Sequence, residues 1–344
     1  MKISYIHIFT AALIGASALP ASAALNPINI YSGNVGLSVD GIGSNSAPVG
    51  QVQANIPVGA TILQAYLYSA GTPYPWYSDS PTTLAAYNSA GITLGGNTIN
   101  NFDTLVGAVS TPRPDIGQWY TARADVTTVV QSLVSGSGTN NFSWDVSEGS
   151  LNNFIDGEVL AIVYSDASLP VGSVALLDGG QNTGGETFAV NLSTPLSDPS
   201  ASGFAAQLGL GISFSCCGQQ STIDVNGTNL TTTAGGNNDG LIGSDGSLIT
   251  VGGLGDDPSN NVGYGSDDEL YDLSSFLHTG DTSFNIFTQN ATADDNIFFA
   301  SLYITGDVSS VTPVPEPQTY MLMGVGLGVV GWAARRRKKQ NITT

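Results

Sequence analysis

The segment Asp125-Val126-Thr127-Thr128-Val129-Val130 is echoed by Asp272-Leu273-Ser274-Ser275-Phe276-Leu277. A glycine-bearing turn and an aromatic strand follow each copy. Each unit then closes on an apolar strand, Leu160-Ala161-Ile162-Val163-Tyr164 or Phe299-Ala300-Ser301-Leu302-Tyr303. The likeness extends upstream, because residues 92–99 resemble residues 223–230. The pattern predicts two copies of one structural unit.

The rest of the body consists of short runs rich in Val, Ile, Thr, Tyr and Phe, separated by clusters of Gly, Asn, Asp, Pro and Ser. Alternation of apolar and polar residues at this spacing indicates antiparallel strands. We therefore predict an all-β fold of two tandem antiparallel β-sandwich modules with a jelly-roll-like arrangement. The predicted strands are Thr61–Tyr68, Glu158–Tyr164, Gly172–Leu177, Thr187–Leu192, Gln207–Phe214, Ser283–Thr288 and Ile297–Thr305.

The echoed segments also predict one short helix in each module. Apolar residues follow Asp125 at helical spacing, and a second set follows Asp272; Asp is a common N-cap residue. Gly136 and Gly280 are the expected stops. The boundary between the modules is placed near Leu169-Pro170. The predicted division is a signal peptide at 1–23, modules at 24–170 and 171–309, and a tail at 310–344.

Charge is distributed very unevenly along the 344 residues. Six of the eight basic residues lie at the two ends, so the body has two basic and 27 acidic residues, a net charge of −25. Such a surface repels phosphate backbones, which argues against a nucleic-acid partner and makes metal cations plausible ligands. The 43 glycines lack the every-third period of collagen.

The N-terminus has the pattern of a secretory signal. Lys2 precedes the apolar run Ile6–Leu19, and Pro20-Ala21-Ser22-Ala23 supplies the small residues that a signal peptidase reads. Cleavage is expected before Ala24. An uncleaved membrane anchor is the alternative, although it needs a longer span.

The C-terminus has three parts in a fixed order. Pro315-Glu316-Pro317 lies in an extended, proline-rich stretch, an apolar segment covers Tyr320–Ala334, and a basic block covers Arg335, Arg336, Arg337, Lys338 and Lys339. The apolar segment predicts a hydrophobic helix, shorter than the roughly 20 residues that cross a bilayer comfortably. The basic block would hold its end on the cytoplasmic side.

Together these parts resemble the PEP-CTERM sorting signal of exported proteins in Gram-negative bacteria. The resemblance covers about the last 30 residues and implies a precursor tethered to the inner membrane, handled by an exosortase-like membrane protease. It also implies a cell-surface or matrix protein linked to exopolysaccharide. The expected partners are therefore signal peptidase, the exosortase and exopolysaccharide.

Nine carboxylates lie within forty residues of the second module, with no lysine or arginine nearby. Hard cations bind several oxygen ligands, so this composition favours Ca²⁺. The candidate ligands are Asp267, Asp268, Asp294 and Asp295, on loops that flank the closing helix and strand. A solvated acidic surface is the alternative interpretation.

The only two cysteines, Cys216 and Cys217, are adjacent. A bond between them would be strained, because neighbouring Cα atoms lie closer than in ordinary disulfides. Free thiols and pairing between chains remain alternatives. The aromatic loop Tyr74-Pro75-Trp76-Tyr77 offers Trp76 and Tyr77 as glycan contacts, or its rings cover the end of the sandwich. Trp119, Tyr120 and Trp144 are expected in the core.

No catalytic constellation stands out. The mature chain keeps one histidine, His278, and has no G-x-S-x-G elbow. Glu148, Glu158, Glu186 and Glu269 are available for glycoside hydrolysis, but abundant acidic residues have other uses. We expect a non-enzymatic exported protein. The alternatives are a calcium-dependent carbohydrate-binding module and, less favoured, a glycoside hydrolase.

Overall fold

The computed structural model describes residues 25–43, 49–71, 84–107, 120–149, 155–182, 184–215, 220–235, 248–259, 269–292 and 295–314. Over these residues the chain is mostly β-strand and all strand pairs are antiparallel, which confirms the predicted all-β class. The strands form four sheets, which we call A, B, C and D and define below. Within the described residues no helix has the length and apolar character needed to cross a bilayer.

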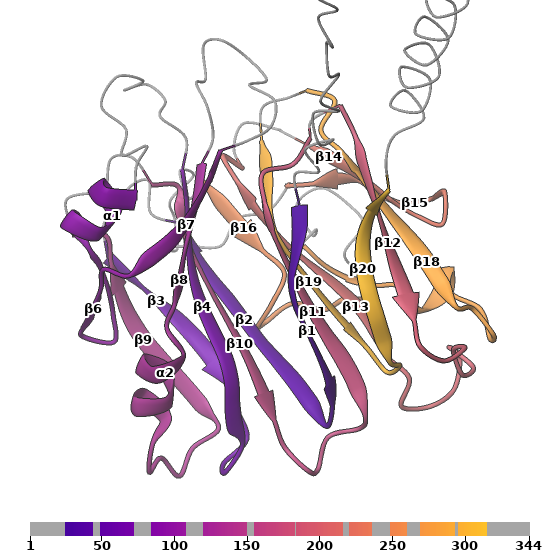
Figure 1. Cartoon of the computed structure of the whole chain (residues 1–344), viewed down its shortest axis with the longest axis horizontal. Coiled ribbons are helices and arrows are strands. Elements are labelled where there is room, and N and C mark those ends of the chain that lie inside the picture. Colours follow the sequence, from indigo (N-terminus) through magenta and orange to yellow (C-terminus); the bar gives the residue numbers. More distant parts are fainter. Residues whose placement is uncertain are drawn as a thin grey trace, which may run out of the picture.

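Sheets B and C contain strands from the first half of the chain (Figure 1). Sheet B has the order β2-β10-β4-β8-β7, and sheet C has the order β3-β9-β5-β6. The strands of sheet B are β2 (Val35–Gly43), β10 (Gly157–Ser165), β4 (Thr61–Gly71), β8 (Tyr120–Asp125) and β7 (Phe102–Gly107). Those of sheet C are β3 (Val49–Asn55), β9 (Asn141–Ser147), β5 (Ile92–Leu94) and β6 (Asn97–Ile99).

Sheets A and D contain the second half, together with the first strand of the chain. Sheet A has the order β1-β11-β19-β13-β16, with β17 also paired to β13, and sheet D has the order β15-β14-β18-β12-β20. The strands of sheet A are β1 (Leu25–Gly33), β11 (Gly172–Gly179), β19 (Asn296–Ile304), β13 (Ala206–Ser213), β16 (Ile249–Val251) and β17 (Leu270–Asp272). Those of sheet D are β15 (Thr228–Ala234), β14 (Ser221–Val225), β18 (Ser283–Gln289), β12 (Glu186–Leu192) and β20 (Val308–Val314).

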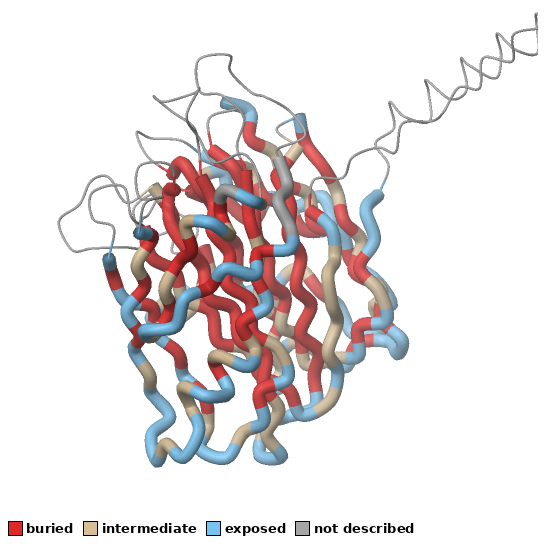
Figure 2. Tube along the Cα trace, turned by 60° about the vertical axis from the view of Figure 1, so that its left-hand side comes forward, coloured by how far each residue is buried: buried red, intermediate tan, exposed pale blue. Residues whose placement is uncertain are grey.

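Three apolar cores join the sheets in the layer order C-B-A-D. One core lies between C and B, a second between A and D, and a third joins B to A. Sheets A and B are therefore covered on both faces, and β10, β11 and β19 are almost wholly buried. Figure 2 shows buried residues concentrated in the middle of the molecule. Burial on both faces explains why these strands read as continuous apolar runs, whereas β3 and β18 alternate.

The two halves repeat the same strand order. The order β2-β10-β4-β8 in sheet B matches β11-β19-β13-β17 in sheet A. In the outer sheets, β3-β9-β5-β6 matches β12-β18-β14-β15. The hairpins β5–β6 and β14–β15 cover the two upstream segments whose sequences are alike. The weak sequence echo is thus accompanied by a repeat of topology.

The predicted helices differ between the halves. Helix α2 (Thr127–Val134) follows Asp125 as expected. Its counterpart after Asp272 is only a 3₁₀ turn, η2 (Ser274–Phe276). Leu277 ends this turn in an extended conformation, and its buried side chain joins the core between sheets A and D. A second helix, α1 (Leu84–Ala90), was not predicted, because only two of its residues are large and apolar.

The pairing of β1 with β11 crosses the boundary predicted at residue 170. At its C-terminal end the folded body extends to Val314, because β20 pairs with β12 as far as this residue. The second module was predicted to end five residues earlier, at residue 309. The division into modules stays a prediction, but β1 lies at the edge of a sheet whose other strands all come from the second half. The predicted hydrophobic helix of the tail lies outside the described residues.

Polar and aromatic side chains also join sheets A and B. Arg123 of β8 pairs with Asp178 of β11 at 2.5 Å, and its guanidinium lies 5.1 Å from the centre of the Tyr66 ring. The rings of Tyr68 and Phe299 are 5.0 Å apart. This interface therefore combines an apolar core with one ion pair.

Candidate functional site

Most residues that the sequence singles out lie outside the described residues. These are the motif Pro315-Glu316-Pro317, the basic block 335–339, Asp267, Asp268, Asp294, Cys216, Cys217, Trp76, Tyr77 and Trp119. Their roles stay predictions. The other two aromatic residues expected in the core, Tyr120 and Trp144, are buried, as predicted.

Asp295 is the one candidate calcium ligand that the structure describes. It is fully buried immediately before β19. One carboxylate oxygen accepts a hydrogen bond from Ser221 Oγ at 3.1 Å, and the Asn290 side chain donates to the Asp295 carbonyl at 3.0 Å. Within the described ranges, no group of three or more His, Cys, Asp or Glu side chains is arranged to hold a metal ion.

Several other carboxylates of the acidic region accept hydrogen bonds from nearby backbone. Asp257 accepts from the backbone N–H of Ser259 at 3.0 Å, and Asp272 accepts from that of Ser274 at 2.9 Å. Asp281 accepts from the N–H of His278 at 2.8 Å. Asp-x-Ser turns of the same kind occur at Asp166 and Asp198. Part of the acidic composition therefore serves turn formation.

The four glutamates considered for hydrolysis are all buried. Glu158 accepts a hydrogen bond from Ser69 Oγ at 3.3 Å, and burial together with the neighbouring Glu148 raises the pKa of Glu158 well above its usual range. Glu269 accepts hydrogen bonds from the Gly235 N–H at 2.6 Å and from the Tyr271 hydroxyl at 2.8 Å. These contacts were not foreseeable, because the partners are distant in sequence or depend on the strand pairing.

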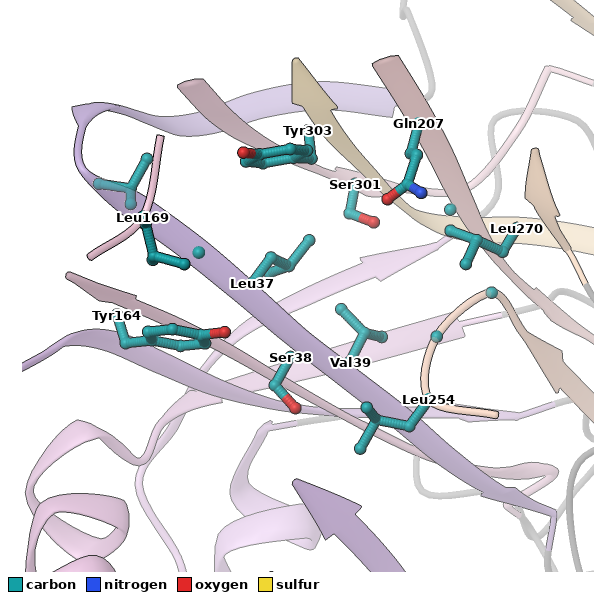
Figure 3. Close-up of a pocket in the computed structure, with 15 residues that line it drawn as sticks. Leu37, Ser38, Val39, Tyr164, Leu169, Gln207, Leu254, Leu270, Ser301 and Tyr303 are labelled. Atoms are coloured by element: carbon teal, nitrogen blue, oxygen red, sulfur yellow. The ribbon is translucent and has the colours of Figure 1, made fainter. Parts of the chain in front are cut away.

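An open cleft of about 280 Å³ lies where sheets A and B separate (Figure 3). Gln207, Ser301 and Tyr303 line it from sheet A, and Leu37 and Val39 line it from sheet B. Gln207 pairs with Tyr303, and Gly209 pairs with Ser301, so these four residues share one face of β13 and β19. The turn at residues 252–254 borders the cleft and is attached to β2 by a hydrogen bond from the Leu254 N–H to the Val39 carbonyl at 2.9 Å.

The two tyrosines of the cleft occupy equivalent positions in the repeat. Tyr164 is the last residue of the segment Leu160–Tyr164 in β10, and Tyr303 is the last residue of the matching segment Phe299–Tyr303 in β19. Burial raises the pKa of both phenols, so both rings are uncharged at neutral pH. This equivalence was the one available sequence signal for the cleft. It could not show that both rings face the same opening.

In the part of the chain that the structure describes, none of the residues lining the cleft is Asp, Glu, Lys, Arg or His. An uncharged lining is unusual in a chain with a net charge of −19. The polar groups are an amide and hydroxyls, and the remaining surface is aliphatic, aromatic or backbone. Such a lining offers hydrogen bonds and apolar contact but no ionic contact.

Comparison with known proteins identifies one region of the chain. The PEP-CTERM protein-sorting motif matches residues 313–338, and no curated protein or solved structure matches. The match begins at Pro313, which pairs with Phe188 as part of β20, so the motif starts inside the last strand of the folded body. The predicted resemblance is confirmed: this chain carries at its C-terminus a PEP-CTERM sorting motif, the mark of an exported protein sorted by an exosortase.

Proposed function

We propose that this protein is a non-enzymatic component of the cell envelope or extracellular matrix and associates with exopolysaccharide. The sorting motif at residues 313–338 is the observation that carries the proposal. The layered β body supports it, because four stacked sheets present a rigid scaffold with loops at their ends. We further propose that the body consists of two jelly-roll-like modules, an interpretation supported by the repeated strand order.

The proposed route begins with export and removal of residues 1–23 by signal peptidase. The tail then holds the precursor at the inner membrane until the exosortase cuts it. Both ends of the body lie at the same end of the molecule, because Leu25 pairs with Gly179 and Val314 pairs with Thr187, across the connection from β11 to β12. This arrangement supports a body tethered to the membrane through one end (Figure 1).

Mass spectrometry of the protein released from cells tests the processing step. The expected C-terminal peptide ends before Arg335, and the first residue follows residue 23. A variant with Pro315→Ala, Glu316→Ala and Pro317→Ala should stay with the membrane fraction. Recovery of released wild-type protein with Arg335–Lys339 intact would contradict the proposal.

A calcium-dependent carbohydrate-binding module is the second candidate function. The proposed calcium ligands are Asp267, Asp268, Asp294 and Asp295, of which Asp295 is a buried carboxylate. Bound Ca²⁺ would stabilise the folded state, so EDTA should lower the melting temperature of the wild-type protein. Asp294→Asn should reduce this decrease. A wild-type melting temperature that EDTA does not change would contradict the calcium site.

A further inference from the structure

We propose that the cleft between sheets A and B binds one unit of a neutral saccharide, with a sugar ring against Tyr303 and its hydroxyls on Gln207 and Ser301. The source of the natural ligand rests on the proposed association with exopolysaccharide. The cleft itself is tested with purified sugars.

Two side chains of the cleft are available for hydrogen bonding. The Gln207 amide and the Ser301 hydroxyl have no hydrogen-bond partner among the described residues, although Ser301 is only 3% exposed. Figure 3 shows both on the same side of the cleft, near Tyr303. A Cβ at residue 209 would lie 2.7 Å from Ser301 Oγ, so Gly209 keeps this hydroxyl uncovered. A ligand that supplies both donors and acceptors would satisfy these groups.

The apolar part of the lining sets the second requirement. Tyr164 and Tyr303 provide ring surfaces, and Leu37 and Leu254 provide aliphatic ones. A sugar ring carries C–H groups on its faces and hydroxyls on its rim, which matches a site with aromatic faces beside an amide and a hydroxyl. The volume of about 280 Å³ is at the small end of ligand sites, so one sugar unit is the expected occupant.

Charge decides between neutral and ionic ligands. Among the described residues, no carboxylate, amine, guanidinium or imidazole lines the cleft, so an ion would lose hydration there without a compensating partner. The strongly acidic body also repels anionic polymers. A neutral saccharide meets both conditions.

Isothermal titration calorimetry on the processed protein tests the proposal. The probes are neutral hexasaccharides of glucose, mannose and galactose, neutral exopolysaccharide purified from the producing cells, and polygalacturonate as an anionic polymer. The wild type should bind at least one neutral probe and should not bind polygalacturonate. Gln207→Ala and Tyr303→Ala should each weaken binding at least tenfold, whereas Tyr303→Phe, which keeps the ring, should change it less than threefold.

Gln53→Ala is the matched control, because Gln53 is an exposed strand residue of sheet C. It should bind like the wild type. Near-UV circular dichroism checks that each variant is folded. If a cleft variant unfolds, Leu254→Arg takes its place, since it puts a bulky charge on a partly exposed residue at the edge of the cleft and should abolish binding.

Three results would overturn the saccharide site: no binding of any neutral probe, binding of polygalacturonate alone, or full binding by all folded cleft variants. Fractionation of cells distinguishes failure of the saccharide site from failure of the proposed association with exopolysaccharide. Wild-type protein absent from the polysaccharide fraction would contradict the association with exopolysaccharide. Cleft variants that reach that fraction as well as the wild type would contradict the cleft and leave the association standing.

Discussion

Asp40 is a carboxylate whose surroundings alter its titration. It lies on β2, accepts a hydrogen bond from the backbone N–H of Gln53 on β3, and is partly buried. Burial raises the pKa of Asp40 to about 6, because the ionised form loses hydration, and the backbone hydrogen bonds reverse only part of this shift. Glu158 shows the same direction of shift at a more deeply buried position.

The raised pKa of Asp40 predicts a pH-dependent loss of stability. Between pH 3.8 and about pH 6 the unfolded chain releases this proton and the folded protein keeps it, so the free energy of unfolding falls as pH rises. An Asp40→Asn variant has no carboxyl group to titrate at this position. Relative to this variant, the wild type should lose about 3 kcal/mol between pH 3.5 and pH 6.5, measured by urea denaturation.

Asp166→Asn is the control for this experiment. Asp166 is partly exposed, and hydrogen bonds from Ser168 lower its pKa, so its contribution to the free energy of unfolding changes only in more acidic solution. Above pH 5 the stability curve of this control should run parallel to that of the wild type. Identical curves for wild type and Asp40→Asn would contradict the role assigned to Asp40.

At the scale of elements, β20 connects the folded body to the sorting tail. It is an edge strand of sheet D, and two of its valines, Val308 and Val311, belong to the core between sheets A and D. The next residues of the strand, Pro313 and Val314, already belong to the matched motif. The same strand therefore completes the core and begins the sorting signal.

This position of β20 predicts a sharp difference between two of its valines. Val311→Ala removes buried methyl groups and should lower the free energy of unfolding by about 2 kcal/mol. Val314→Ala is the matched control, because Val314 is 38% exposed and should tolerate the change within about 0.5 kcal/mol. Chemical denaturation of both variants measures the two free energies of unfolding. A loss for Val311→Ala no larger than that for Val314→Ala would contradict the position of Val311 in the core.

At the scale of the whole molecule, the contact between sheets A and B joins the two halves of the chain. Arg123 is the only lysine or arginine among the described residues, and it pairs across this interface with Asp178. Burial raises the pKa of Asp178 although Arg123 acts in the opposite direction. The ion pair therefore compensates for a carboxylate that the interface would otherwise leave without a cation.

Removing the cation should destabilise the interface more than removing the pair. Arg123→Met leaves Asp178 buried and should cost about 3 kcal/mol of unfolding free energy. The double variant Arg123→Met with Asp178→Leu removes both charges and should recover most of that loss. Chemical denaturation of Arg123→Met, Asp178→Leu and the double variant gives the coupling energy between the two side chains. Strictly additive losses would contradict the pairing.

Sequence patterns alone were sufficient for the parts of this protein that depend on local chemistry. The strands follow from alternating or continuous apolar runs, the duplicated unit from the Asp125 and Asp272 segments, and the sorting motif from the order of Pro315-Glu316-Pro317, the apolar stretch and the basic block. The strands and the sorting motif are patterns of neighbouring residues, and the repeat is a likeness between two short segments. Helix α1 escaped prediction because its short sequence has too little apolar periodicity.

Only the tertiary structure decided the stacking of four sheets, the burial of Glu158 and Glu269, and the cleft that Tyr164 and Tyr303 share. These depend on which strand faces are covered and on contacts between residues that the folding of the chain brings together. A continuous apolar run such as β10 reveals that both faces are buried, but not what covers them. For that reason the sequence alone determined the sorting motif, whose signal lies in neighbouring residues, whereas only the fold determined which residues line the cleft.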